Sequence, residues 1–137
     1  MNERERELFN DSLERCTQRS DFIDRFYEKF LSSSEEVREK FKNTDFKRQR
    51  RMLHSSLYLL VFASEGREEG VLHLDRIAKL HSRHQLDIQP HLYNLWAECL
   101  LATVKDCDPR FSEDVGQAWR SMIRIGVDHL VKRYQQS

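Results

Sequence analysis

Glycine, proline and cysteine are scarce in this chain. Only 4 glycines, 2 prolines and 3 cysteines occur among its 137 residues. So few turn-forming residues disfavour an all-β architecture, which needs many tight turns. The cysteines, Cys16, Cys99 and Cys107, have no CxxC spacing. We therefore expect neither a disulfide framework nor a structural zinc site.

The chain also lacks net charge and long apolar runs. Its 23 Lys and Arg balance 23 Asp and Glu, so no overall field draws it toward nucleic acid or an anionic membrane. No apolar run reaches the roughly 18 residues that span a bilayer, and the charged N-terminus is unlike a secretory signal. We expect a cytoplasmic protein with a single domain, residues 1–137, that binds neither nucleic acid nor membrane.

Apolar residues recur at three- and four-residue spacing along almost the whole chain, which predicts an all-α protein. About seven helices of unequal length are expected, at residues 8–16, 22–31, 35–41, 46–61, 71–84, 90–104 and 112–134. A break at Gly66–Gly70 separates the fourth from the fifth. On the fifth helix, a broad inward face is expected to carry Leu72, Leu74, Ile77, Ala78, Leu80 and His81. Such unequal helices fit poorly with a symmetric four-helix bundle.

The histidines are the most informative candidates for chemistry. There are six of them: His54, His73, His81, His84, His91 and His129. They form no HExxH motif, zinc cluster or paired carboxylate–histidine motif. His81 is expected to point inward because it follows an apolar face, and His84 is one turn further on. An inward histidine alone is more often a hydrogen-bonded core residue than a ligand.

Several short segments, taken in order, resemble parts of a known family. They are FYEKF at 26–30, EVREKF at 36–41, QRRML at 49–53, IAKLH at 77–81, LDIQPHLY at 86–93, and Ala118-Trp119 with Tyr134. Their order and spacing, over nearly the whole chain, resemble the single-domain bacterial globins and the globin modules of sensor proteins. The resemblance implies a globin fold of about seven helices around a haem pocket.

On the proximal side of that pocket, the resemblance implies that His81 binds the iron of haem b (iron protoporphyrin IX) as a neutral imidazole. Tyr93 matches a position that hydrogen-bonds near this histidine, and Phe41 matches the phenylalanine that packs flat on the porphyrin. With His81 as the ligand, the segment to Tyr93 is slightly longer than in the family. With His84 as the ligand, the segment to Tyr93 is slightly shorter than in the family. His84 therefore stays the alternative ligand.

On the distal side, the resemblance implies that Tyr27 donates a hydrogen bond to a bound gas. Gln49 and Leu53 lie one helical turn apart and match the two distal positions, an amide for hydrogen bonding and an aliphatic group that shapes the pocket. A register error of one residue would instead bring His54 to the iron and give a six-coordinate haem. We favour Gln49 and Leu53.

The resemblance implies reversible binding of O₂, and also of NO and CO, for oxygen transport or gas sensing. Where flavohaemoglobins pair the proximal histidine with a glutamate, this chain has Leu130, which disfavours redox turnover. The alternatives are an NO dioxygenase that uses an external reductase, since no GxGxxG motif is present, and a haem-free globin-fold signalling module. An exposed apolar stripe on the last two helices, which carry Trp96 and Trp119, would indicate a homodimer.

One basic cluster has two interpretations. It comprises Arg38, Lys40, Lys42, Lys47, Arg48, Arg50 and Arg51. In the first interpretation, the cluster is a face of the protein that is exposed to solvent. In the second, one or two of these cations meet the haem propionates at the rim of the pocket. Interspersed acidic residues and the lack of an aromatic platform disfavour a nucleic-acid patch.

Overall fold

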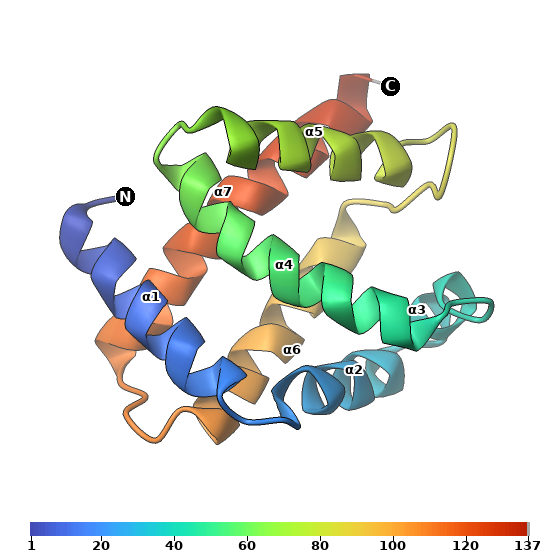
Figure 1. Cartoon of the computed structure of the whole chain (residues 1–137). Coiled ribbons are helices and arrows are strands. Elements are labelled where there is room, and N and C mark those ends of the chain that lie inside the picture. The colour runs from blue at the N-terminus through green and yellow to red at the C-terminus, as the bar shows by residue number, and fades with distance from the viewer. Residues whose placement is uncertain (137) are drawn as a thin grey trace.

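The computed structural model describes residues 1–136 and confirms the all-α prediction. Within these residues there are seven helices and no strand. They are α1 (Glu3–Thr17), α2 (Phe22–Ser33), α3 (Glu35–Lys40), α4 (Phe46–Ser64), α5 (Glu68–His81), α6 (His91–Cys107) and α7 (Glu113–Gln136). Figure 1 shows their arrangement.

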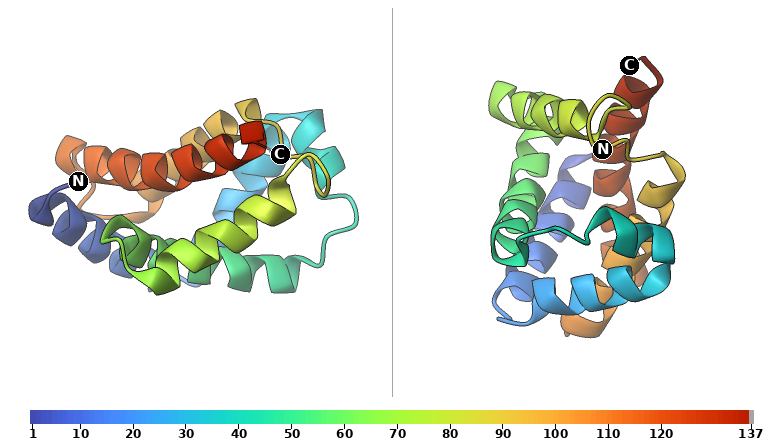
Figure 2. Two further views of the ribbon diagram at one scale, coloured as in Figure 1. Left: turned by 90° about the horizontal axis from the view of Figure 1, so that it is seen from above. Right: turned by 90° about the vertical axis from the view of Figure 1, so that its right-hand side faces the viewer.

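The helices cross one another rather than running side by side as in a bundle. α4 runs obliquely across the front of the view in Figure 1, with α5 packed on it and α7 passing behind. α1 packs on α7, and α2 packs on α6. The two further views show the same crossings from above and from the side (Figure 2). This arrangement leaves a space that side chains from α2, α3, α4, α5, α6 and α7 border.

Local capping explains where three of the helices begin. Asn2 and Glu5 form a capping box at the start of α1. The side chain of Ser34 accepts a hydrogen bond from the Val37 N–H, and that of Asp45 accepts from the first turn of α4. Each side chain satisfies an N–H that has no partner within the helix. The cap at Ser34 allows the short α3 to follow α2 without a loop.

The expected bounds of α5 were wrong at both ends. The helix begins at Glu68, so Gly70 lies inside it, and it ends at His81 rather than His84. Only Gly66, with φ 73°, occupies the left-handed region in this turn. The expected broad apolar face is also narrower than predicted, because Leu72 and Leu80 are 47% and 42% exposed. The buried face of α5 centres on Leu74 and Ala78.

Gly70 is required by the close approach of α4 and α5. A Cβ added there would lie 2.1 Å from the backbone nitrogen of Ala63, on the neighbouring helix. We expect Gly70→Ala to lower the free energy of unfolding by about 1–3 kcal/mol through overpacking, although alanine ordinarily favours a helix by about 1 kcal/mol. Urea unfolding followed by circular dichroism measures this.

Gly66→Ala is the matched control, since a Cβ there meets nothing within 4 Å. Its positive φ alone should cost about 1–2 kcal/mol. A Gly70→Ala protein as stable as the wild type would show that the two helices do not need this contact.

The core contains both aromatic and polar groups. Trp119, Phe9 and Phe26 are fully buried, and the Phe9 and Trp119 rings lie 4.6 Å apart. Ser12 and Asp108 are buried beside them, and the Trp119 indole donates a hydrogen bond to the Ser12 hydroxyl. Trp119 is therefore a core residue.

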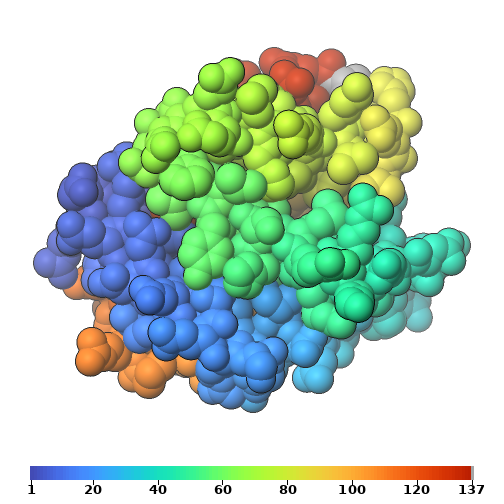
Figure 3. Space-filling view, viewed as in Figure 1, coloured from blue at the N-terminus to red at the C-terminus, as the bar shows by residue number. Residues whose placement is uncertain are grey.

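The exposed apolar side chains do not form a stripe on the last two helices. In the part of the chain that the structure describes, the large exposed ones are Met1, Met52, Tyr58, Val71, Leu72, Leu80 and Leu86. Most belong to α4 and α5, which meet along the face shown in Figure 3. Among the described residues, α6 and α7 therefore carry no exposed apolar stripe of the kind that would indicate a dimer. No observation tests the homodimer itself, which stays a prediction. Within residues 1–136, no helix has the length and apolar character to cross a membrane.

Candidate functional site

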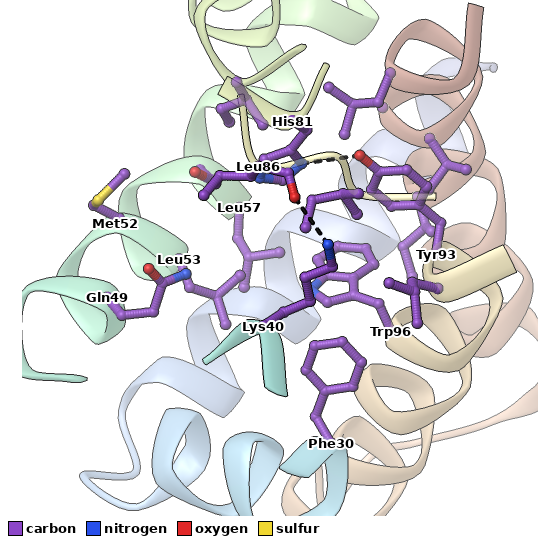
Figure 4. Close-up of a pocket in the computed structure, with 18 of the residues that line it drawn as sticks. Phe30, Lys40, Gln49, Met52, Leu53, Leu57, His81, Leu86, Tyr93 and Trp96 are labelled. Atoms are coloured by element: carbon purple, nitrogen blue, oxygen red, sulfur yellow. Dashed lines mark hydrogen bonds between the residues drawn. The ribbon is translucent and has the colours of Figure 1, made fainter. Parts of the chain in front are cut away.

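A cavity of about 280 Å³ lies between α2, α3, α4, α5, α6 and α7. Its wall is mostly leucine, isoleucine, valine and aromatic side chains (Figure 4). All six residues that the sequence predicts for the haem pocket line it: Tyr27, Phe41, Gln49, Leu53, His81 and Tyr93. Four different helices and the residue after α3 contribute them, so the fold brings together positions up to 66 residues apart.

His81 is the last residue of α5 and reaches into the cavity wall. Burial lowers the pKa of its imidazole to about 4, so the ring is neutral at physiological pH. Its Nδ1 lies 2.9 Å from the Tyr93 hydroxyl, drawn as a dashed line in Figure 4. Because Tyr93 occupies Nδ1, the other ring nitrogen, Nε2, is the one that can bind a further group.

The loop after α5 holds His81 in place from the backbone side. The N–H of Ile88 donates to the carbonyl of His81 at 3.0 Å, and the N–H of Leu86 donates to that of Leu80 at 2.9 Å. These bonds satisfy carbonyls that a helix end leaves without partners. Asp87 takes a positive φ of 51° in this loop, and its carboxylate accepts a hydrogen bond from the Tyr134 hydroxyl of α7. The loop is therefore tied to both α5 and α7.

Tyr27 and Gln49 form a second polar group in the cavity. Tyr27 is only 6% exposed. Burial raises the pKa of its phenol to about 12, although side-chain hydrogen bonding with Gln49 opposes this shift. The hydroxyl therefore keeps its proton and can act as a donor. Figure 4 shows Gln49 reaching into the cavity from α4 and His81 from α5.

Phe41 and Leu53 shape the space around this polar group. The Phe41 ring packs edge-on against Tyr27, with centroids 6.0 Å apart, and stacks on Phe46 at 5.9 Å. Leu53 is buried one turn after Gln49. Gln49 and Leu53, which were expected to face the same way, therefore both face the cavity.

The two alternative histidines lie elsewhere. His54 is exposed, and its ring lies 5.2 Å from that of Tyr58 on the outer face of α4. His84 is exposed in the loop after α5. Neither belongs to the residues that line the cavity. The helix rotation of about 100° per residue places His54 away from the face that carries Leu53.

Two polar contacts in the cavity wall, made by His73 and Lys40, were not predicted from the sequence. His73 lines the cavity, and its Nε2 lies 2.9 Å from the Ser56 hydroxyl across the α4–α5 contact. Its spacing of eight residues from His81 on one helix was the available signal. Lys40 also lines the cavity, where its Nζ donates to the Leu86 carbonyl at 3.0 Å. No local pattern distinguished Lys40 from its basic neighbours.

These crossed helices, with His81 at the end of α5 facing an apolar cavity, define a protein of the globin class. The family model "Globin" matches residues 24–130, and the chain belongs to the globin family. A solved structure similar to it is protein PA3967 from Pseudomonas aeruginosa PAO1, described as structurally highly homologous to a human haemoglobin. The two are 32% identical, with 95% of this chain and 98% of that one covered and a TM-score of 0.89. A comparison with curated proteins gives no match.

Proposed function

We propose that this chain binds haem b and, through its iron, reversibly binds O₂ and also NO or CO. The observation that carries the proposal is the state of His81. It is a neutral imidazole in the wall of an apolar cavity, with Nδ1 engaged by Tyr93 and Nε2 available. Neutral histidine of this kind is the usual protein ligand of haem iron in globins.

The side chains present fit such a group. Within residues 1–136, no three His, Cys, Asp or Glu side chains are grouped so that they could hold a metal ion. A metal bound through His81 would therefore take its other ligands from outside these side chains, as haem iron does from its porphyrin. An apolar cavity bordered by Phe41, Leu53 and Trp96 suits a flat porphyrin rather than a hydrated ion.

Tyr93 is a suitable partner for the tautomer that this role requires. Nε2 can bind iron only if the imidazole proton is on Nδ1, where the Tyr93 hydroxyl oxygen, 2.9 Å away, can accept it. Burial raises the pKa of Tyr93, so this hydroxyl also keeps its own proton. When bound, haem supplies an iron atom with an open coordination position for a diatomic gas.

Tyr27 and Gln49 are suited to stabilising such a gas. The Tyr27 phenol is an uncharged donor in a buried setting, where a hydrogen bond is electrostatically stronger than in water. Gln49 lies next to it and can orient its hydroxyl. Together they would slow the loss of a polarised ligand.

Leu130 lies in the cavity wall at the position where a glutamate would be expected in the flavohaemoglobins. A carboxylate hydrogen-bonded to the proximal imidazole would increase its electron donation. The apolar Leu130 cannot do so, and Tyr93 is a neutral partner. This arrangement favours reversible gas binding over redox turnover such as NO dioxygenation.

The visible spectrum of the purified chain after addition of haem tests the proposal. We expect a Soret band and a five-coordinate ferrous spectrum. Absence of a Soret band would overturn the proposal and favour a haem-free globin module. A six-coordinate low-spin ferrous spectrum would show that a second side chain reaches the iron and that the open site is wrong.

Tyr27→Phe tests the distal donor. Loss of a hydrogen bond to a partly charged ligand is worth about 1.5–3 kcal/mol, so we expect the O₂ dissociation rate to rise at least about tenfold. Stopped-flow measurement of O₂ displacement by CO gives this rate. Tyr58→Phe is the control, because the Tyr58 hydroxyl pairs with Thr17 outside the cavity. Equal rates in Tyr27→Phe and wild type would exclude Tyr27 from ligand binding.

A further inference from the structure

Two different sides of α4 carry apolar side chains. The first set is buried and faces the core: Leu53, Leu57, Leu60 and Val61. The second set recurs at three- and four-residue spacing on another side of the helix: Met52, Ser55, Leu59 and Phe62. Within the described chain, the core cluster and the side chains packed on it include the first set but not the second. A helix at the surface of a protein needs only one such stripe for its own core.

α5 extends the second set of α4 with two exposed leucines. His73 lies on the side of α5 that meets α4, because its ring contacts the Ser56 hydroxyl. Leu80 is seven residues after His73, which is about two turns, and so lies on nearly the same side. Leu72 directly precedes His73. We call the combined surface the α4–α5 face: Met52, Ser55, Leu59, Phe62, Leu72 and Leu80. The two helices that carry it lie on the surface turned to the viewer in Figure 3.

The two ends of the α4–α5 face carry opposite charge. Exposed cations lie at the start of α4: Lys47, Arg48 and Arg51. Exposed anions lie at the other end, where α4 turns into α5: Glu65, Glu68 and Glu69. Arg67 offsets one of these anions by pairing with Glu69. α4 has 19 residues, so at about 1.5 Å per residue its two ends are about 28 Å apart.

We propose that the α4–α5 face binds a second copy of this chain about a two-fold axis near Ser55. In such an isologous contact both copies use the same surface, and the two surfaces run in opposite directions. The basic end of each copy then lies over the acidic end of its partner, which is complementary in charge. Ser55 is the midpoint of α4, and its small side chain permits close approach of the two helices. The contact does not depend on haem.

Leu72→Glu tests the apolar part of this interface. Sedimentation equilibrium of the full chain over a wide range of concentration measures the dissociation constant of the dimer. A carboxylate at the buried centre of the interface should raise that constant at least about tenfold. Leu72 is 47% exposed in the single chain, so the helices should remain, which far-UV circular dichroism checks.

Val71→Glu is the matched control for Leu72→Glu. Val71 is also exposed, at 37%, but it lies two residues before His73 and is rotated about 200° from the side of α5 that meets α4. The same charge at this position should leave the dissociation constant unchanged.

Exchange of charges tests the two-fold arrangement. Arg48→Glu and Glu65→Arg should each raise the dissociation constant about five- to tenfold, because each exposed pair occurs twice across the axis. The double variant should return the constant to nearly the wild-type value, since each end of the face then meets an opposite charge again.

Three results would overturn the proposal. A wild-type chain that stays monomeric throughout the concentration range would mean that a partner of other chemistry covers this face. A dimer that Leu72→Glu leaves intact, or that Val71→Glu weakens equally, would place the interface elsewhere, such as on α6 and α7. A double charge variant that is as weak as the single variants would contradict the two-fold arrangement.

Discussion

His81→Ala is expected to abolish tight haem retention while leaving the helical fold in place. Removing a side chain that only supports a metal ligand typically weakens metal binding by about 10–100-fold, so removing the ligand itself should accelerate haem loss by more than about 100-fold. The measurement is the rate of Soret change on transfer to a haem-scavenging apoprotein. Far-UV circular dichroism of the apo-protein checks that the helices remain.

His84→Ala is the matched control, because His84 is exposed three residues later and does not line the cavity. Added imidazole should partly restore the Soret band of His81→Ala, since it can occupy the vacated position, and should leave His84→Ala unchanged. Haem retention by His81→Ala equal to that of wild type, with loss in His84→Ala, would reverse the assignment of the ligand.

The second large effect concerns Asp108, whose side chain is fully buried. It accepts hydrogen bonds from the Ser12 hydroxyl at 2.6 Å and from Arg15 Nε at 2.6 Å. The Arg110 N–H donates to it at 2.9 Å. We expect Asp108→Ala to lower the free energy of unfolding by about 3–5 kcal/mol, because Arg15 and Ser12 lose their buried partner. Urea titration of the apo-protein measures the change.

Asp106→Ala provides the contrast two residues earlier. Asp106 pairs with Lys29 at 2.9 Å, but both side chains are more than a third exposed. Such a pair contributes only about 0–1 kcal/mol. Similar losses of stability in the two variants would mean that the buried network does not hold α1 to the end of α6.

Because of the same network, the free energy of unfolding depends on pH. Burial alone would raise the pKa of Asp108, but hydrogen bonds from Arg15 and Ser12 outweigh it and hold the pKa below its usual value. The stabilisation is therefore complete above the unfolded-state pKa of about 3.9 and is lost as pH falls through the lower folded-state value. Asp108→Asn should flatten the fall in unfolding free energy below about pH 4.

Local patterns in the sequence predicted the helices, and the resemblance to globins supplied the residues around the cavity. Gln49 and Leu53 are one turn apart, so their shared direction follows from helix geometry alone. The resemblance to globins supplied Tyr27, Phe41, His81 and Tyr93, and the structure places each of them in the cavity wall. The end of α5 at His81 could not be read locally, because the loop's backbone hydrogen bonds terminate it.

Side chains whose roles depend on distant partners could not be predicted from the sequence. Asp108 follows the sixth predicted helix and carries no local signal of its role, whereas Ser12 and Arg15, more than 90 residues away, make it a buried anchor. In the sequence, Lys40 is one of the seven residues of the basic cluster, and only its hydrogen bond to the Leu86 carbonyl distinguishes it. His73 lines the cavity, where its ring contacts the Ser56 hydroxyl of a neighbouring helix.

The scarcity of glycine, proline and paired cysteine, together with helical periodicity, was enough by itself to determine an all-α chain of about seven helices. Those properties are local, since each depends on residues within a few turns. The cavity, the choice of His81 over His84 for its wall, and the buried Asp108 network were decided only by the tertiary structure. Their physical cause is the burial and hydrogen bonding of groups that only the crossing of the helices brings into contact.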